Sequence, residues 1–458
     1  MYGIKQSEFE AEFLGKSGSF QHKTNIKYNL FPFTGSTSDK PLDSFDNILG
    51  AFLRNIYSLS QPSEINREDI ISKICGDMTF DDNPANETAF RELVKDIYFV
   101  DSENLKCTSI NTYKYTSSTK NDHKISEYIV SALCDKGKII KALSEIDTSS
   151  GNLLDKLVEG CLPELKSKAT ETKYLALMPQ IAECFTKDLV FLIKDSDSEF
   201  YDMIQLISYY YFFYTSQVVL NLNRFCKGTM EICPVYFIMS WEKTSKTREC
   251  STRGWHQIEG KLNSMFSHAV LLEMLNQTGQ DNKYSYRDIF EEYENSSYED
   301  KKRIFSEIEE LKNKYRTMYA EPDGFIYTEN NYSTDDIESL ISGFFDDIML
   351  QFEKTARSRA NEAYQNSFHS FCRNNFLQNR KKNGLMLALN EEQLVLLTKI
   401  IIGNKKQMRL NTLFEEFKIR GIFMDKLTQE AVVEFYEKLN LIEKKSDSGD
   451  AQYVKGIL

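Results

Sequence analysis

Cationic side chains between residues 354 and 382 form the strongest electrostatic feature of this 458-residue sequence. Such side chains bind the phosphates of a nucleic acid or an acidic protein surface. The seven cations oppose only Glu362, which leaves a local charge of +6, and they are Lys354, Arg357, Arg359, Arg373, Arg380, Lys381 and Lys382. The aromatic residues between them are Tyr364, Phe368, Phe371 and Phe376. Rings in this setting can stack on the bases of a single strand. The alternative is a long helix with a solvated basic face and an aromatic face in the core.

A second group of cations lies between Trp241 and Trp255. Hydroxyl side chains surround these cations, and both kinds of group donate hydrogen bonds to phosphate or carboxylate. The pattern therefore predicts an anion site. In the alternative interpretation, the two tryptophans fix a loop on the core and its charges are solvated. The candidate residues are Lys243, Lys246, Arg248 and Arg253.

Hydrolytic chemistry has weaker support. A metal-dependent nuclease needs carboxylates and a lysine at an Asp…Glu-x-Lys spacing, to hold a cation and activate water. The matching sets are Asp155, Glu164 and Lys166, and Asp300, Glu310 and Lys312. Both sets lie in segments of helical pattern, whereas such carboxylates usually lie on adjoining strands. With 68 acidic and 56 basic residues, matches of this kind arise by chance.

The sequence predicts neither a cofactor nor a metal. It contains no Gly-rich phosphate-binding loop and no His-Glu-x-x-His pattern. The nine cysteines include no Cys-x-x-Cys pair, and the five histidines are scattered. This distribution is typical of reduced thiols in a cytoplasmic protein. We therefore expect a protein that is not an enzyme.

The elements that position these residues are predicted to be mainly α-helical. Glycine and proline are scarce, at 20 and 8 residues, and apolar residues recur at i, i+3 and i+4. Residues 203–222 carry no charge but include polar groups such as Gln217 and Asn221. Such groups are costly in hydrocarbon. This segment is therefore expected to be a buried helix, and we expect no membrane association.

Four regions follow from these patterns. We expect a large helical domain, then a long helix, then a winged-helix-like domain at the C-terminus. Their bounds are an irregular N-terminal arm at 1–43, the helical domain at 44–285, an acidic helical region with a long basic-ended helix at 286–386, and the winged-helix-like domain at 387–458.

The C-terminal region has the element order of a winged helix. Helices are predicted at 391–402, at 410–418 and from a cap at Thr428 to Leu439, followed by two short strands. The exposed face of the third helix is acidic, which favours a protein partner over the DNA groove that such a helix often enters. The acidic residues on that face are Glu430, Glu434 and Glu437. The lysines of the hairpin that remain candidate DNA contacts are Lys444, Lys445 and Lys455.

The net charge of −12 is distributed unevenly. Residues 288–347 hold 17 acidic and 6 basic side chains. This acidic block is followed directly by the basic stretch that begins at Lys354. One part of the surface is therefore expected to repel DNA and another to be able to approach it, a polarity that favours an adaptor over a free-standing DNA-binding protein.

Three stretches resemble the DptG family of bacterial DNA phosphorothioation-dependent restriction proteins. The first is Lys27-Tyr-Asn-Leu-Phe-Pro-Phe33. The second is Trp241-Glu-Lys-Thr-Ser-Lys-Thr-Arg248 with Gly254-Trp255. The third, which is the most specific, runs from Leu439 to Val454.

The resemblance implies a subunit of an antiviral defence assembly that acts with DptF-like and DptH-like partners against DNA without sulfur in its backbone. It supplies no catalytic residues for this chain. Our leading expectation is a non-catalytic subunit that bridges partners through its acidic region and winged helix. The alternatives are a DNA-binding protein that uses the basic helix and winged helix, and a divergent metal-dependent nuclease.

Overall fold

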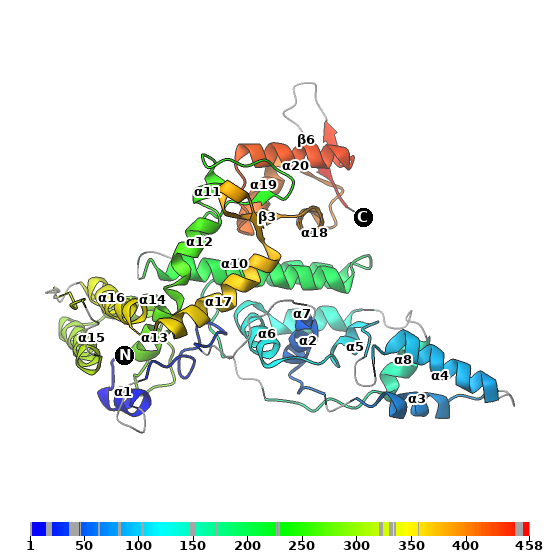
Figure 1. Ribbon diagram of the computed structural model, residues 1–458, viewed down its shortest axis with the longest axis horizontal. Coiled ribbons are helices and arrows are strands. Elements are labelled where there is room, and N and C mark those ends of the chain that lie inside the picture. Colours follow the sequence, from blue (N-terminus) through cyan, green and yellow to red (C-terminus); the bar gives the residue numbers. More distant parts are fainter. Residues whose placement is uncertain are drawn as a thin grey trace. The chain divides into compact units, whose positions relative to one another are not determined.

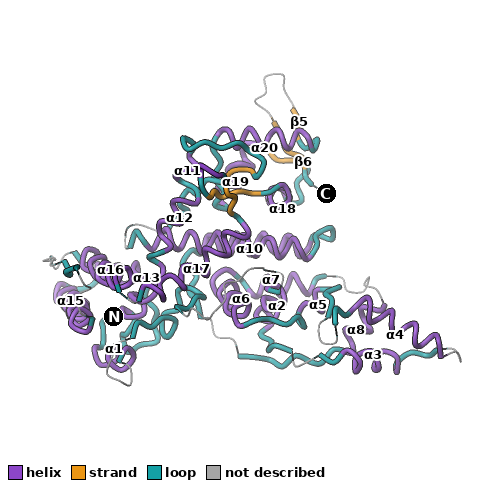
Figure 2. The backbone as a smooth tube through the Cα atoms, viewed as in Figure 1, coloured by secondary structure: helices purple, strands orange, loops and turns teal. Residues whose placement is uncertain are grey.

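The computed structural model has a mainly α-helical fold with a few short strands, as the sequence predicts. Figure 1 shows the elements in sequence colours, and Figure 2 distinguishes helices from strands. None of the helices in the described part of the chain combines the length and the apolar character that crossing a membrane requires. The structure describes residues 2–14, 21–35, 45, 47–62, 65–80, 84–101, 105–146, 153–169, 173–225, 227, 230–319, 324–328, 333, 336–355, 357–444 and 452–457.

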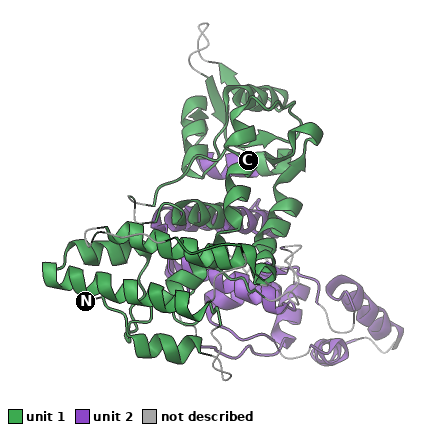
Figure 3. Ribbon diagram, turned by 60° about the vertical axis from the view of Figure 1, so that its left-hand side comes forward, with its two compact units in different colours: residues 1–43, 212–395, 405–457 green, residues 44–211, 396–404, 458 purple. Residues whose placement is uncertain are grey.

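The chain divides into two compact units, and of the predicted domain boundaries only the one between residues 43 and 44 coincides with a boundary between them (Figure 3). Unit 1 contains residues 1–43, 212–395 and 405–457. Unit 2 contains residues 44–211, 396–404 and 458. The predicted boundaries at 286 and 387 followed changes in composition, whereas unit 1 is assembled from segments far apart in sequence.

Unit 2 is helical. Its helices are α2 (Ile48–Tyr57), α3 (Arg67–Gly76), α4 (Pro84–Tyr98), α5 (Ile110–Tyr113), α6 (Lys120–Leu133), α7 (Lys136–Ser144), α8 (Leu153–Cys161) and α9 (Pro179–Lys194). Helices α2 and α6 pack together, and the Asn55 side chain donates a buried 2.7 Å hydrogen bond to the Ser126 hydroxyl between them. The apolar uncharged segment forms α10 (Phe200–Leu222), whose first half belongs to unit 2 and second half to unit 1.

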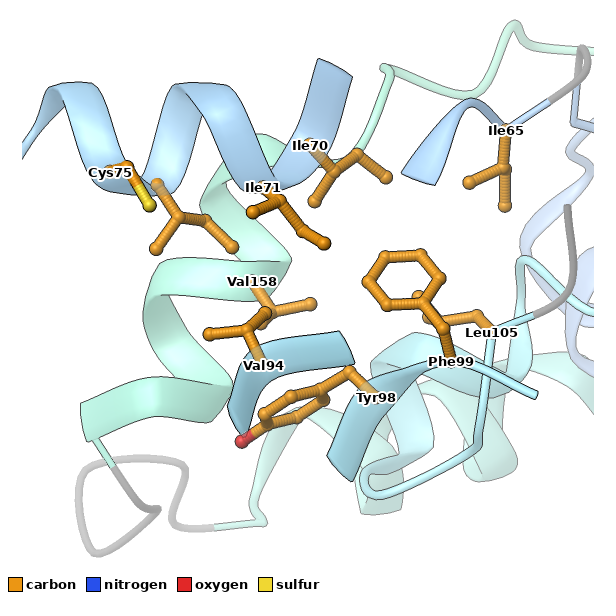
Figure 4. Close-up of a cluster of buried hydrophobic side chains, with 10 residues drawn as sticks. Ile65, Ile70, Ile71, Cys75, Val94, Tyr98, Phe99, Leu105 and Val158 are labelled. Atoms are coloured by element: carbon orange, nitrogen blue, oxygen red, sulfur yellow. The ribbon is translucent and has the colours of Figure 1, made fainter. Parts of the chain in front are cut away.

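A separate cluster of apolar side chains lies between α3, α4 and α8 (Figure 4). Ile71 and Ile74 from α3 face Val94 from α4 and Val158 from α8, and all four side chains are almost fully buried. Ile71 and Ile74 are three residues apart on α3, which places both on one face of the helix. This cluster is the apolar core of the part of unit 2 that α3, α4 and α8 form.

Unit 1 surrounds helices α12 (Trp255–Leu262), α13 (Met265–Leu275), α16 (Ile337–Lys354) and α17 (Ser358–Asn375). Every residue of α13 is buried, and this helix packs against α16 and α17. The other helices of unit 1 are α1 (Gln6–Phe13), α11 (Glu249–Thr252), α14 (Tyr286–Glu294), α15 (Tyr298–Met318), α19 (Leu410–Ile419) and α20 (Lys426–Lys438).

Two three-stranded sheets also belong to unit 1. In the first, β3 (Leu385–Leu389) lies between β1 (Ile238–Met239), with which it is parallel, and β2 (Leu377–Asn379), with which it is antiparallel. The second is antiparallel and is formed by β4 (Gln407–Arg409), β6 (Gln452–Lys455) and β5 (Ile442–Lys444), in that order. Helix α18 (Glu391–Ile402) precedes β4 in the chain, and its residues from Leu396 onward belong to unit 2.

The C-terminal elements follow the predicted order, with the further strand β4 between the first two helices. Asp425 begins α20 by accepting a 3.0 Å hydrogen bond from the backbone N–H of Thr428. The predicted cap, Thr428, is therefore an internal residue of the first turn. Asp is a better N-cap than Thr, and the helix begins at the earlier residue.

The described residues of the N-terminal segment do not form an irregular arm. It contains α1, and the Tyr2 hydroxyl donates a buried 2.8 Å hydrogen bond to the carbonyl of Leu275. Polar and glycine-rich stretches suggested an arm, but the aromatic residues between them enter the core. The buried aromatic residues of this segment are Tyr2, Phe9, Phe13, Tyr28, Phe31 and Phe33.

The predicted long basic-ended helix is two helices. Helix α16 ends at Lys354, and Thr355 has extended backbone angles, φ −125° and ψ 177°. Its hydroxyl donates to the carbonyl of Gln351 and accepts from the N–H of Arg357. Thr side chains compete with helical backbone bonds in this way, so the chain turns before α17 begins.

Candidate nucleic-acid interface

Two segments distant in sequence lie side by side in unit 1. Residues 240–248 follow β1 and are called here the 240–248 loop, and residues 380–384 connect β2 to β3 and are called the 380–384 turn. The parallel pairing of Met239 with Leu389 places the start of the loop at the C-terminal end of β3, and the antiparallel pairing of Asn379 with Leu385 places the turn at the N-terminal end of β3. The loop reaches the turn through side-chain contacts along the sheet.

Direct hydrogen bonds join the loop to the turn. The side-chain amide of Asn383 donates to the carbonyl of Thr244 at 3.0 Å and approaches its hydroxyl at 3.2 Å. The guanidinium of Arg380 donates to the carbonyls of Met239 and Ser240 at 3.2 and 2.8 Å. Arg380, a predicted nucleic-acid contact, therefore uses its hydrogen bonds to position the loop.

Arg248 fixes the other end of the loop from within the protein. Its side chain is 7% exposed, and it donates to Glu242 at 2.9 Å and to the two carboxylate oxygens of Asp425 at 2.8 and 2.5 Å. A further bond of 2.6 Å reaches the Thr428 hydroxyl. Arg248 was predicted to bind an external anion, but its guanidinium is occupied by carboxylates of this chain.

The charges of this network stabilise one another. Hydrogen bonds from Arg248 to Asp425, followed by those to Glu242, raise the pKa of Arg248 despite its burial. Burial alone would raise the pKa of Asp425, but the hydrogen bonds from Arg248 and Thr428 hold that pKa below its usual value. Bidentate pairs of this type are among the stronger hydrogen-bonded contacts in proteins.

Four lysines project from the loop and the turn. They are called the four-lysine surface, and they are Lys243, Lys246, Lys381 and Lys382. All four are exposed, and none forms an ion pair with another residue in the described part of the chain. Glu242, the only carboxylate in these two segments, is buried against Arg248. The exposed hydroxyls of Ser245 and Thr247 accompany the lysines.

The structure thus brings together residues from both predicted sites. Lys243 and Lys246 come from the predicted anion site, whereas Lys381 and Lys382 come from the end of the basic stretch. Arg253, the remaining member of the anion site, pairs with Glu249 at 2.9 Å and lies over the ring of Tyr236.

The remaining cations of the basic stretch lie on other elements. Arg357 lies over the ring of Tyr319 and donates to Gln351 at 3.2 Å, and Lys354 lies over Phe325. Arg359 and Arg373 are exposed on α17. The aromatic residues that alternate with the cations are core residues and are not available for base stacking, since Tyr364, Phe368, Phe371 and Phe376 are at most 2% exposed.

The predicted acidic face of α20 is present. Glu430, Glu434 and Glu437 are exposed, and Glu437 pairs with Lys444 of the hairpin at 2.9 Å. Lys455 is exposed as well. Lys445 lies outside the described residues.

Members of both nuclease-like sets form contacts with residues outside those sets. Asp155 accepts hydrogen bonds from the Tyr98 and Thr108 hydroxyls at 2.5 and 3.2 Å. In the second set, Glu310 is exposed, whereas Lys312 is buried with Asp347. Within the described ranges, no group of three His, Cys, Asp or Glu side chains is placed to hold a metal ion.

Sequence reasoning missed Asp425 and Glu242 as the partners of Arg248. The pairing of Arg248 with Asp425 spans 177 positions, and no local pattern reports such a contact. A signal was present for Glu242, because a carboxylate six residues before an arginine in a loop between tryptophans can close that loop. No protein-family model matches the chain, and no curated protein matches it significantly.

Proposed function

We propose that this chain is a non-catalytic subunit of a bacterial DNA phosphorothioation-dependent restriction complex, in which it bridges DptF-like and DptH-like partners. The observation that carries the proposal is that all three stretches resembling the DptG family belong to unit 1 and make contacts that stabilise it. If the resemblance reflects a common fold, these stretches are expected to lie where they stabilise that fold.

The first stretch is held by a buried carboxylate. Glu273 on α13 is fully buried and accepts hydrogen bonds from the backbone N–H groups of Ile26, Lys27 and Tyr28 at 3.0, 2.8 and 3.1 Å. Burial raises the pKa of Glu273, and these three donors oppose that shift. The N-terminal aromatic segment is thereby fixed to the core of unit 1.

The other two stretches meet at α20. The second stretch ends at Arg248, which binds Asp425 at the start of α20. Gly254, which follows it, admits no side chain, because an added Cβ would lie 2.4 Å from the carbonyl oxygen of Cys250. The third stretch forms β5 and β6, which pair with β4. The order of these elements supports the proposal of a winged-helix-like domain.

Two acidic surfaces are suited to docking partners. One is the exposed face of α20 with Glu430 and Glu434. The other is proposed to be formed by the acidic residues of α14 and α15, of which Glu294 and Glu310 are exposed. Charge complementarity at such surfaces sets partner choice and the rate of association. A cytoplasmic setting suits the eight described cysteines, which are all free thiols.

The test is co-expression with the DptF-like and DptH-like subunits, followed by affinity purification on this chain and size-exclusion chromatography. Wild-type protein is expected to elute with both partners. A bridging role predicts that Glu430→Lys with Glu434→Lys, and Glu294→Lys with Glu310→Lys, each lose a different partner and retain the other.

The matched control reverses two exposed acidic residues in unit 2, Asp96→Lys with Glu183→Lys, and should retain both partners. Folded wild-type protein that elutes alone would refute membership of the complex. If both docking variants and the control retain both partners, the acidic surfaces are not the bridging sites.

A further inference from the structure

We propose that the four-lysine surface binds the phosphate backbone of nucleic acid. This inference goes beyond the bridging role and does not depend on membership of a restriction complex. It places the contact on Lys243, Lys246, Lys381 and Lys382, and not on the helix that the sequence favoured.

The first support is that inward-facing side chains hold the loop and the turn in place. Arg248 donates hydrogen bonds to the carboxylates of Glu242 and Asp425, and Arg380 donates one to the carbonyl of Ser240. Asn383 joins the loop to the turn. Lysines on two separate flexible segments would lose conformational entropy on binding an anion. Lysine backbones that are already fixed side by side lose less, which favours a multivalent anion.

The second support is uncompensated charge. Glu242 forms its ion pair with the buried Arg248 and is 5% exposed on its side chain, so it does not pair with the lysines at the surface. Elsewhere on the surface of unit 1, cations commonly pair with carboxylates, as Arg287 does with Glu291 and Arg303 with Glu307. Clustered lysines without such partners repel one another unless an anion joins them.

The third support is the backbone of Lys381. This residue has a φ of 54°, which lies in the left-handed region that glycine or asparagine adopts at lower cost. Gly384, at the end of the same turn, also has a positive φ of 78°. A lysine at such an exposed position costs stability, and strained residues of this kind cluster at ligand-binding sites.

The composition of the surface favours phosphate over an acidic protein. Protein interfaces are enriched in aromatic residues and arginine and depleted in lysine. Here the arginines are turned inward, and most of the exposed groups are lysine ammoniums and the hydroxyls of Ser245 and Thr247. The one aromatic residue of the loop, Trp241, is 36% exposed and packs against Phe435 of α20. Ammonium, hydroxyl and backbone N–H groups are the usual donors to a phosphate backbone.

The experiment measures fluorescence anisotropy of the full-length protein with a labelled DNA duplex of about 20 base pairs and with one of its strands, from about 50 to about 300 mM salt. The test variant changes Lys243, Lys246, Lys381 and Lys382 to Gln. If each lysine neutralises one phosphate, the slope of log affinity against log salt should fall in magnitude by about 3 to 4 for the duplex. The single strand should lose slightly less, because each of its phosphates contributes about 0.7.

The matched control removes the same four charges from exposed lysines elsewhere, Lys120, Lys141, Lys187 and Lys302, and should keep the wild-type slope. Equal thermal melting of both variants excludes unfolding as a cause. The proposal is overturned if wild-type protein does not bind at low salt, if the test variant retains the wild-type slope, or if the control loses as much as the test variant. Binding of a polyglutamate peptide at equal charge with no binding of DNA would also overturn it, in favour of an acidic protein partner.

Discussion

Arg248 and Asp425 are separated by 177 positions in sequence and form a bidentate ion pair, with N–O distances of 2.8 and 2.5 Å, beneath the surface of unit 1. The pair connects the end of the 240–248 loop to the first turn of α20. The loop that presents two exposed lysines and the helix that presents the acidic face are therefore joined by this pair, together with the hydrogen bonds of Thr428 with Arg248 and Glu242. A change in either is expected to reach the other through this pair.

Removal of the arginine should destabilise unit 1. Arg248→Met leaves Glu242 and Asp425 with most of their surface buried and without their cation, and breaking a buried pair in this way costs about 3–5 kcal/mol. We expect that loss in the free energy of unfolding measured by urea denaturation. The control is Arg253→Met, because Arg253 and Glu249 form an exposed pair of a kind that contributes at most about 1 kcal/mol. Similar losses in the two variants would contradict a structural role for Arg248.

Glu273→Gln should loosen the N-terminal segment. Glutamine keeps the shape of the side chain but replaces one acceptor oxygen by an N–H₂ group, which would face the backbone N–H groups of Lys27 or of Ile26 and Tyr28. An unsatisfied buried group of this kind costs about 1–3 kcal/mol. Hydrogen exchange should show faster exchange at the amides of residues 26–28. Unchanged protection there would mean that the carboxylate does not hold the segment.

The sequence predicted features that depend on local pattern. Periodic apolar residues predicted α10 and α18, and the spacing of glutamates predicted the exposed face of α20. Contacts between distant residues left no such pattern. The pair of Arg248 with Asp425 and the hydrogen bond of Asn383 with Thr244 each required the tertiary fold.

The four-lysine surface was also predictable only in part from the sequence. The sequence identified all four exposed lysines, but in two separate groups and together with arginines of the same charge. Charge alone did not distinguish an arginine that faces inward from a lysine that faces outward. Arg380 and Lys381 are adjacent in sequence, yet one is bonded to backbone carbonyls and the other is exposed.

His268 should make the protein less stable in mild acid. The ring is fully buried, its Nδ1 lies 2.9 Å from the Tyr286 hydroxyl, and it stacks on Phe345. Burial lowers its pKa from 6.5 to about 3, and the charge of Lys261 acts in the same direction. Between these two values the unfolded chain binds a proton that the folded chain does not. The free energy of unfolding should therefore fall as the pH falls below 6.5, by about 1.4 kcal/mol for each pH unit from this residue.

The measurement is urea denaturation at several values between about pH 7 and about pH 5. His268→Asn removes the titrating group while retaining a polar atom near Tyr286, so its stability should depend less steeply on pH than that of the wild type. Parallel curves for the two proteins would show that His268 does not contribute to the acid sensitivity.

Lys381→Gly separates the charge of the four-lysine surface from its backbone strain. The left-handed conformation of Lys381, with φ 54°, costs about 1–2 kcal/mol in a residue with a Cβ, whereas glycine adds about 0.5–1 kcal/mol of entropy cost on folding. The variant should therefore be as stable as the wild type or slightly more stable, and it should bind DNA less tightly because one ammonium is lost.

Lys382→Gly is the matched control, because Lys382 lies in the same turn and is not among the described residues with positive φ. It should lose a similar amount of DNA affinity but also lose about 0.5–1 kcal/mol of stability. Thermal melting of the two variants measures their stability, and fluorescence anisotropy measures their affinity for DNA. Equal changes in stability would show that the left-handed conformation of Lys381 does not destabilise the protein.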